Sequence, residues 1–155
     1  MTVADKLVAL LKAQEKTCAT AESCTGGGIG SAITAVPGSS AVFAGGVISY
    51  SNDVKRDVLG VKPETLSSVG AVSSETAAQM AQGVRNLLKT DFAVAVTGIA
   101  GPDGGTDDKP VGTIWFGLAT PEGVRTEKCL FMGDREQVRA QTIIHALGML
   151  TIAAS

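Results

Sequence analysis

Histidine is almost absent from this 155-residue chain, which contains His145 and no other. A single histidine excludes a zinc site built on two or more His ligands and leaves a Ser-His-Asp triad with one candidate base. His145 lies in QTIIHALGML, a mostly apolar stretch of helical pattern, and we interpret it as a packing or interface residue. No pair of cysteines has metal-site spacing, so we expect neither a metal centre nor a cofactor.

Cysteine, basic charge and long apolar runs are also scarce. Three widely spaced cysteines, Cys18, Cys24 and Cys129, indicate reduced thiols and a cytoplasmic protein. A net charge of −2 argues against a nucleic-acid partner. No apolar run reaches the roughly 18 residues of a membrane span, and the first residues resemble an amphipathic helix rather than a signal peptide. A hydrophobic content of 45% predicts buried subunit surface, and hence a homo-oligomer.

Periodicity predicts one domain over residues 1–155, in which helices and strands alternate. Helices are expected at 3–16, 26–36, 51–59, 73–90 and 134–153. Strands are expected at 17–21, 42–51 and 91–98, followed by a hairpin over 113–133 that turns at Pro121-Glu122-Gly123. Strand–helix units followed by a late hairpin predict an α/β fold, a three-layer α/β/α sandwich with a mixed sheet.

A first glycine loop lies in ATAESCTGGGIGSAI, residues 19–33, between a strand and a helix. Glycines allow a ligand to approach the backbone, and a helix N-terminus offers free N–H groups to an anion or an oxyanion. Ser23 is preferred to Cys24 as the nucleophile because no histidine is placed to pair with Cys24, although a helix N-terminus would acidify a thiol there. A tight turn without function is the alternative. The candidate ligand-binding residues of this loop are Glu22, Thr25, Gly26 and Gly27.

Lys55 is the best-placed base, in SYSNDVKRDVLG after the second strand. In the first turn of a helix, the dipole would lower the pKa of its ammonium group, and burial would lower it further. A neutral lysine can act as a general base. Spacing alone favours another reading, a solvated lysine paired with Asp53 or Asp57. Tyr50 ends the strand and directs a hydroxyl group into the same region.

A second glycine loop, TGIAGPDGG, follows the apolar strand 91–98. Such a loop can line a pocket for a ribose or phosphate group, or it can be a flexible surface excursion. Arg135 and Arg139 share one face of the last helix, where phosphate contact and a surface ion-pair face are equally consistent with the pattern. The predicted ligand-binding residues of this region are Thr97, Gly98, Gly101, Gly104, Gly105 and Arg139.

Four motifs in sequence order carry a resemblance to a known family: TAESCTGGGIG, GGVISYSNDVKRDVLGV, GAVSSETA and AVTGIAGPDGGTDDKPVGTIWFGLA. Over residues 5–150, the chain resembles the C-terminal domain of CinA-type competence/damage-inducible proteins. The resemblance implies a three-layer α/β/α fold, a dimer or larger assembly, and a metal-free serine–lysine pair. The matching positions are Ser23 and Lys55, with Tyr50 as the motif tyrosine. Gly28 departs from the larger residue expected in some relatives.

The resemblance also implies an activity, the hydrolysis of nicotinamide mononucleotide to nicotinate mononucleotide and ammonia. Ser23 would attack the carboxamide while Lys55 takes and returns the proton, assisted by Tyr50. Backbone N–H groups near 25–27 would hold the oxyanion, with Glu22 contributing to a mildly acidic pocket. One alternative is an amidase for another carboxamide. A second is a nucleotide-binding or regulatory module without turnover, in which the same residues only contact a ligand.

Overall fold

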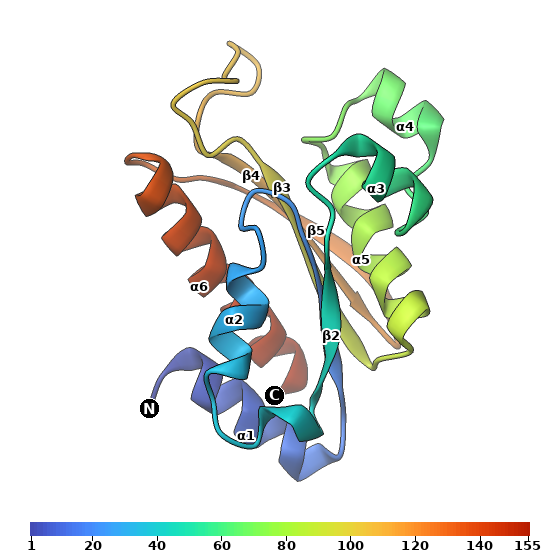
Figure 1. Ribbon diagram of the computed structural model, residues 1–155, viewed down its shortest axis with the longest axis vertical. Coiled ribbons are helices and arrows are strands. Elements are labelled where there is room, and N and C mark those ends of the chain that lie inside the picture. Colours follow the sequence, from blue (N-terminus) through green and yellow to red (C-terminus); the bar gives the residue numbers. More distant parts are fainter.

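The chain is described here by a computed structural model that covers residues 1–155. Its centre is a five-stranded sheet with the strand order β2-β1-β3-β4-β5 (Figure 1). β1 pairs in parallel with β2 and β3, whereas β4 pairs antiparallel with β3 and with β5. The strands are β1 (Cys18–Glu22), β2 (Phe43–Ile48), β3 (Phe92–Gly98), β4 (Thr113–Thr120) and β5 (Gly123–Leu130).

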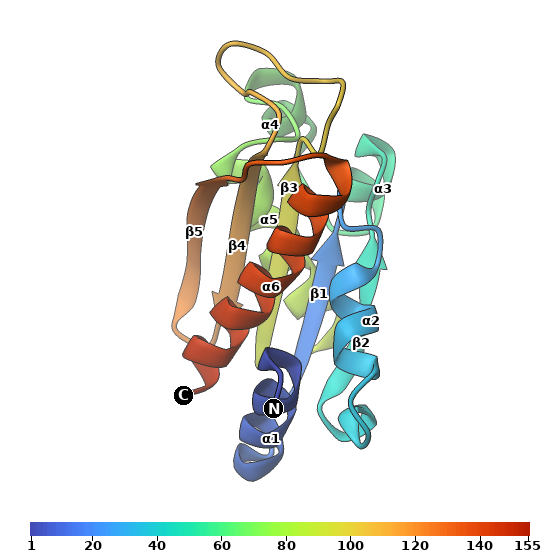
Figure 2. The ribbon, with the colours of Figure 1, turned by 90° about the vertical axis from the view of Figure 1, so that its left-hand side faces the viewer.

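Helices cover both faces of the sheet, which confirms the three-layer α/β/α sandwich predicted from the sequence (Figures 1 and 2). One face carries α1 (Val3–Gln14), α2 (Gly28–Thr34) and α6 (Arg135–Ala154). The other carries α3 (Asn52–Asp57), α4 (Pro63–Ser68) and α5 (Ser74–Leu88). A short 3₁₀ turn, η1 (Ser39–Ala41), leads into β2. No helix is both long enough and apolar enough to cross a membrane.

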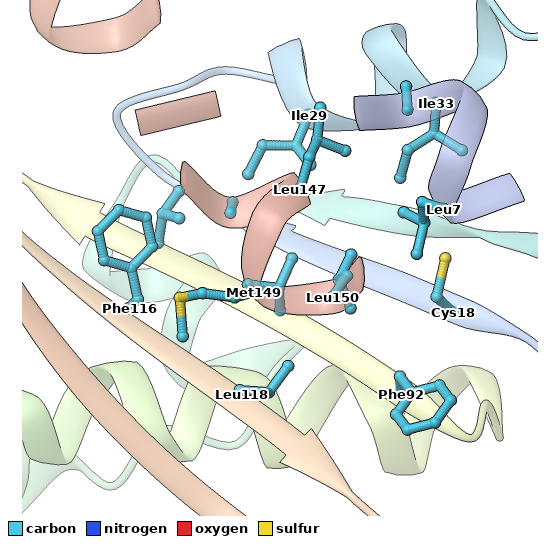
Figure 3. Packing of buried hydrophobic residues seen from close by; sticks show 14 of the residues in the cluster. Leu7, Cys18, Ile29, Ile33, Phe92, Phe116, Leu118, Leu147, Met149 and Leu150 are labelled. Atoms are coloured by element: carbon cyan, nitrogen blue, oxygen red, sulfur yellow. The ribbon is translucent and has the colours of Figure 1, made fainter. Parts of the chain in front are cut away.

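Two apolar cores separate the layers. The larger lies under α1, α2 and α6, where Leu7, Ile29 and Leu150 belong to one apolar cluster with sheet residues such as Cys18 and Phe116 (Figure 3). The smaller lies under α5, and half of its ten buried residues are alanines of the strands. Small residues let α5 approach the sheet closely: a Cβ added at Gly117 would lie 2.2 Å from the Ala77 carbonyl oxygen. Tight packing on both faces fixes the strand ends on which the site is built.

Gly28, the departure noted in the sequence, lies where α2 meets α6. A Cβ at this position would lie 2.5 Å from Cδ1 of Ile143 on α6. A larger residue here would therefore force Ile143 to move. Glycine lets the two helices pack closely beside the loop that carries Ser23.

Candidate active site

A pocket of about 280 Å³ opens at the carboxyl ends of the three parallel strands. Ligands in open α/β sheets bind at this edge. The loop after β1, the segment from the end of β2 into α3, and the long loop after β3 all contribute to its walls. Its polar side chains are those of Ser23, Tyr50, Asn52, Lys55, Thr97, Asp103 and Arg135.

Ser23 and Lys55 meet at the bottom of this pocket. Nζ of Lys55 lies 3.1 Å from Oγ of Ser23 and donates also to the carbonyl oxygens of Ser49 at 2.7 Å and Tyr50 at 3.3 Å. The backbone N–H of Ser23 donates to the Val96 carbonyl on β3, which fixes the serine at the end of β1. Two parallel strands thus bring together residues that lie 32 positions apart in the sequence.

Lys55 is almost completely buried, with 1% of its surface exposed, and no carboxylate pairs with it. Burial lowers the pKa of the Lys55 ammonium group below its ordinary value of 10.5. The surface ion pair with Asp53 or Asp57 is thereby excluded; those two carboxylates contact Arg56 instead. The lowered pKa agrees with the sequence prediction, and of the two causes predicted, the helix dipole and burial, it is burial that lowers it. Lys55 lies in the last turn of the six-residue α3, and the cause is desolvation.

Cys24 also lines the pocket but is poorly suited to attack. Its side chain is 6% exposed, and burial raises the pKa of its thiol to about 11. The acidification expected from the helix N-terminus is therefore outweighed by desolvation. At neutral pH Cys24 is a thiol, and Ser23 is the residue that has a base within hydrogen-bond distance.

Glu22 does not line the pocket, contrary to its predicted role in ligand binding. The side chain is 2% exposed and turns toward the start of α2. Its Oε1 accepts hydrogen bonds from the Thr25 hydroxyl at 2.6 Å and the Ile29 N–H at 2.9 Å. Oε2 accepts from the Gly30 N–H at 3.0 Å and from Thr20 at 3.3 Å. The chain's own carboxylate therefore occupies the anion-binding end of α2.

Arg139 likewise contacts the loop after β1 and does not line the pocket. Its guanidinium donates to the carbonyl oxygens of Cys24 at 3.0 Å and Thr25 at 3.1 Å. In a planar trans peptide the C=O and the following N–H point in opposite directions. The Thr25 N–H is therefore directed away from Arg139, and no acceptor in the protein is paired with it. Thr25, Gly26 and Gly27 shape the loop without lining the pocket, and both glycines have positive φ.

Arg135, one turn earlier on α6, is the arginine that reaches the pocket. It donates to the Gly101 carbonyl at 2.9 Å and to the Tyr50 hydroxyl at 3.4 Å. Tyr50 is 65% exposed at the pocket rim, and its hydroxyl contacts neither Ser23 nor Lys55. The backbone carbonyl of Tyr50, rather than its side chain, holds the lysine.

Most of the second glycine loop lies where the sequence predicts. Thr97, Gly98, Gly101 and Gly104 line the pocket, whereas Gly105 does not. The Thr97 hydroxyl donates to the Ala71 carbonyl at 2.8 Å, so this residue ties the segment before α5 to the end of β3.

The comparisons with known proteins identify the family. The model of the CinA C-terminal domain matches residues 1–153. The chain belongs to the CinA C-terminal domain family. A putative competence-damage inducible protein of Acetivibrio thermocellus is 54% identical over 134 residues, which are 86% of this chain and 32% of that protein. A CinA-like protein of Parasynechococcus marenigrum is 51% identical over 96% of this chain and 36% of its own length. The chain thus spans about a third of these curated relatives.

Solved CinA-superfamily structures share the whole fold. The competence/damage inducible protein CihA of Agrobacterium tumefaciens has a TM-score of 0.95 and 44% identity, with 98% of this chain and 93% of that chain covered. A competence or damage-inducible protein of Enterobacter asburiae also has a TM-score of 0.95, at 34% identity, and covers 100% of this chain and 99% of that chain. The fold and family expected from the four motifs are therefore confirmed.

Within this CinA domain, three polar pocket residues are missing from the ligand-binding set predicted by the sequence: Asn52, Asp103 and Arg135. Asn52 stands beside the N-cap Ser51, and its sequence context indicates only a helix-capping role. The spacing of Arg135 and Arg139 places both on one helix face but does not say which of them reaches the pocket. Asp103 is the carboxylate that the sequence offers in the second glycine loop, and the structure places it in the pocket.

Proposed function

We propose that this chain is a serine amidase that hydrolyses the carboxamide of nicotinamide mononucleotide, releasing nicotinate mononucleotide and ammonia. The observation that carries the proposal is the 3.1 Å contact between the buried Lys55 amine and the Ser23 hydroxyl in the floor of a pocket. A nucleophile held against a base of lowered pKa is the arrangement that acyl transfer requires. The choice of substrate rests on the resemblance of the Ser23 and Lys55 motifs.

In the first half of the reaction, neutral Lys55 accepts the hydroxyl proton as Ser23 Oγ attacks the carboxamide carbon. The tetrahedral intermediate carries its negative charge on the former carbonyl oxygen. The N–H groups of Cys24, Thr25 and Gly27 donate to no backbone carbonyl, so they are the donors available beside the serine. The N–H groups of Ile29 and Gly30 are excluded because Glu22 already accepts them.

Collapse of the intermediate breaks the carbon–nitrogen bond. Protonated Lys55 gives its proton to the leaving nitrogen, which departs as ammonia and leaves an ester on Ser23. Water then attacks the ester, and Lys55 takes one of its protons and returns it to Ser23. One water is consumed for each carboxylate and ammonia formed. The mechanism needs no participation of the Tyr50 hydroxyl.

The rest of the substrate lies along the wall formed by residues 97–104 in this proposal. Arg135 supplies the positive charge at this wall for the phosphate group, and Asp103 supplies an acceptor for ribose hydroxyl groups. The α2 N-terminus takes no part in phosphate binding because Glu22 fills it.

The test is ammonia release from nicotinamide mononucleotide by the purified chain in the presence of EDTA. We expect turnover by the wild type and a loss of at least about 10³-fold in Ser23→Ala, with binding of the substrate still measurable by calorimetry. Ser31→Ala, an exposed serine on α2, is the matched control and should keep wild-type rates. Full activity in Ser23→Ala would overturn the serine mechanism. A folded wild type that binds the nucleotide without turnover would support the regulatory module instead.

Cys24→Ala separates the two adjacent nucleophiles. Because the Cys24 thiol stays protonated and has no base beside it, we expect kcat within about tenfold of wild type. The reagent iodoacetamide should also leave the native enzyme active over a time that inactivates a thiolate-dependent amidase. If Cys24→Ala abolished turnover while Ser23→Ala did not, the thiol would be the nucleophile.

The pH dependence of the rate should report Lys55. Only the neutral amine can accept the serine proton, and its fraction rises with pH toward the Lys55 pKa, which burial places below 10.5. The value of kcat/KM is therefore expected to rise with pH with unit slope and to level off at a midpoint lower than that of an ordinary lysine. A pH–rate profile between mildly acidic and mildly alkaline pH measures this. A flat profile would argue against an amine base.

A further inference from the structure

A second group of chemically active side chains lies between β5 and α6, outside the pocket. Glu127 and Cys129 are two residues apart on β5 and therefore share one face of the strand. His145 on α6 faces them. Its Nε2 lies 3.2 Å from Oε1 of Glu127 and 3.7 Å from Sγ of Cys129. All three ligand atoms lie within 4.8 Å of one another.

A hydrogen bond from Nε2–H of His145 to Glu127 leaves the Cys129 thiol with only weak partners, since sulfur is both a weak donor and a weak acceptor. A carboxylate oxygen and a sulfur converge on the same ring nitrogen, and a neutral imidazole offers at most one proton there. The single N–H can be directed to Glu127, while the Cys129 thiol keeps its own proton until a metal ion displaces that proton and binds the thiolate. A cation placed between the three atoms would contact all of them.

The spacing suits a tetrahedral zinc-type ion. Bond lengths of about 2.3 Å to sulfur, 2.0 Å to nitrogen and 2.1 Å to oxygen place neighbouring ligand atoms about 3.3–3.6 Å apart. The two separations involving His145 lie close to this range. Thiolate, imidazole and carboxylate are also the ligands on which zinc is most often found.

We infer that Glu127, Cys129 and His145 form a binding site for a divalent cation of the zinc type. The site has three protein ligands, and the fourth position is open to water because the His145 and Glu127 side chains are 31% and 40% exposed. Phe116 and Phe131 pack against the imidazole, with ring centroids at 4.6 and 6.0 Å, and provide a firm apolar backing. The inference is independent of the amidase proposal, since none of the three residues lines the pocket.

The spacing of these three residues in the sequence does not indicate a metal site. The lone histidine excludes sites with two histidines, and the cysteines are not paired, so the sequence predicts no metal. The three ligands become neighbours only because β5, the edge strand, lies beside the strands that α6 covers (Figure 2). A bound ion would join this outer strand to the helix that carries Arg135 and Arg139.

The experiment is a titration of the untagged, reduced, EDTA-stripped chain with Co²⁺ alone, followed by absorption spectroscopy. We expect one equivalent of Co²⁺ to give thiolate-to-metal charge-transfer and tetrahedral d–d bands, and one equivalent of Zn²⁺ to bleach them. Cys129→Ser should abolish the charge-transfer band. Glu127→Gln should weaken binding at least as much as loss of an outer-shell partner, about 10–100-fold. Zn²⁺ should raise the Tm of the wild type but not of Cys129→Ser.

Cys24→Ala is the control, since it removes a thiol elsewhere and should leave the spectrum unchanged. The inference is overturned if folded wild type shows no such bands at millimolar Co²⁺, or if they survive in Cys129→Ser. Circular dichroism establishes that each variant is folded. No substrate is used, and the amidase assay contains EDTA, so the two proposals fail or succeed separately.

Discussion

Replacing Lys55 with methionine is expected to lower kcat by roughly 10²–10⁴-fold, the usual contribution of a general base. Methionine has a similar length and can fill the buried space that the lysine stem occupies. Losing the donor to the Ser49 carbonyl destabilises the fold, while removing a buried amine stabilises it. Because these effects oppose, we expect the unfolding free energy to change by about 1 kcal/mol or less. Steady-state ammonia release and urea denaturation measure the two quantities.

Two companion variants make this result specific. Lys55→Arg retains a positive charge that cannot be deprotonated, so it should be as inactive as Lys55→Met. Arg56→Met changes the neighbouring side chain on α3, which is exposed and lies outside the pocket, and should keep rates within about twofold of wild type. Substantial activity in Lys55→Arg would mean that the charge of Lys55, and not its basicity, matters.

Glu22→Gln is expected to lower the unfolding free energy by about 2–4 kcal/mol. The carboxylate accepts four hydrogen bonds, two at each oxygen. Glutamine replaces one acceptor oxygen with an NH₂ group, which would face two donors wherever it is placed. It also removes a negative charge from the positive end of α2. Urea or thermal denaturation at neutral pH would measure the loss.

Glu75→Gln provides the matched comparison, since Glu75 is an exposed carboxylate in the first turn of α5. An exposed site of this kind should change stability by no more than about 0.5 kcal/mol. Equal effects of the two substitutions would show that Glu22 contributes little beyond an ordinary helix-end charge. Kinetics would add a second test. Because Glu22 does not line the pocket, the KM of folded Glu22→Gln should stay close to the wild-type value even though its unfolding free energy falls.

The elements could be predicted well because their patterns are local. The apolar strand over residues 91–98, the two-residue hairpin turn after Thr120 and the Asp134 cap of the last helix all follow from short-range chemistry. Neighbouring parallel strands then place the segments after β1 and β2 together. Pairing Ser23 with Lys55 required both this topology and the family resemblance, since spacing alone favours a surface lysine.

The direction and reach of side chains were harder to predict. Glu22 and Ser23 are adjacent, and only the alternation of side chains along β1 indicates that they point in different directions. Along this strand Ala19 and Ala21 face α5, whereas Cys18 faces the larger core on the other side of the sheet. If the alternation continues to Glu22, the Glu22 side chain points toward α2. This alternation was the one sequence signal that indicated a structural role for Glu22. Arg135 and Arg139 share a helix face. Which of them reaches the pocket depends on how α6 packs against the sheet, and the helical spacing does not give this.

The hydrogen bonds from Arg139 to the carbonyl oxygens of Cys24 and Thr25 affect the order in which the chain folds during its synthesis. These hydrogen bonds join residues 115 and 114 positions apart, whereas Ser23 and Lys55 are 32 apart. Contacts that close long loops form late, and α6 leaves the ribosome after every other element of this domain. A nascent chain can therefore bring serine and lysine together well before their loop has its final shape. Under the amidase proposal, activity is then expected to be among the last properties that the newly made chain acquires.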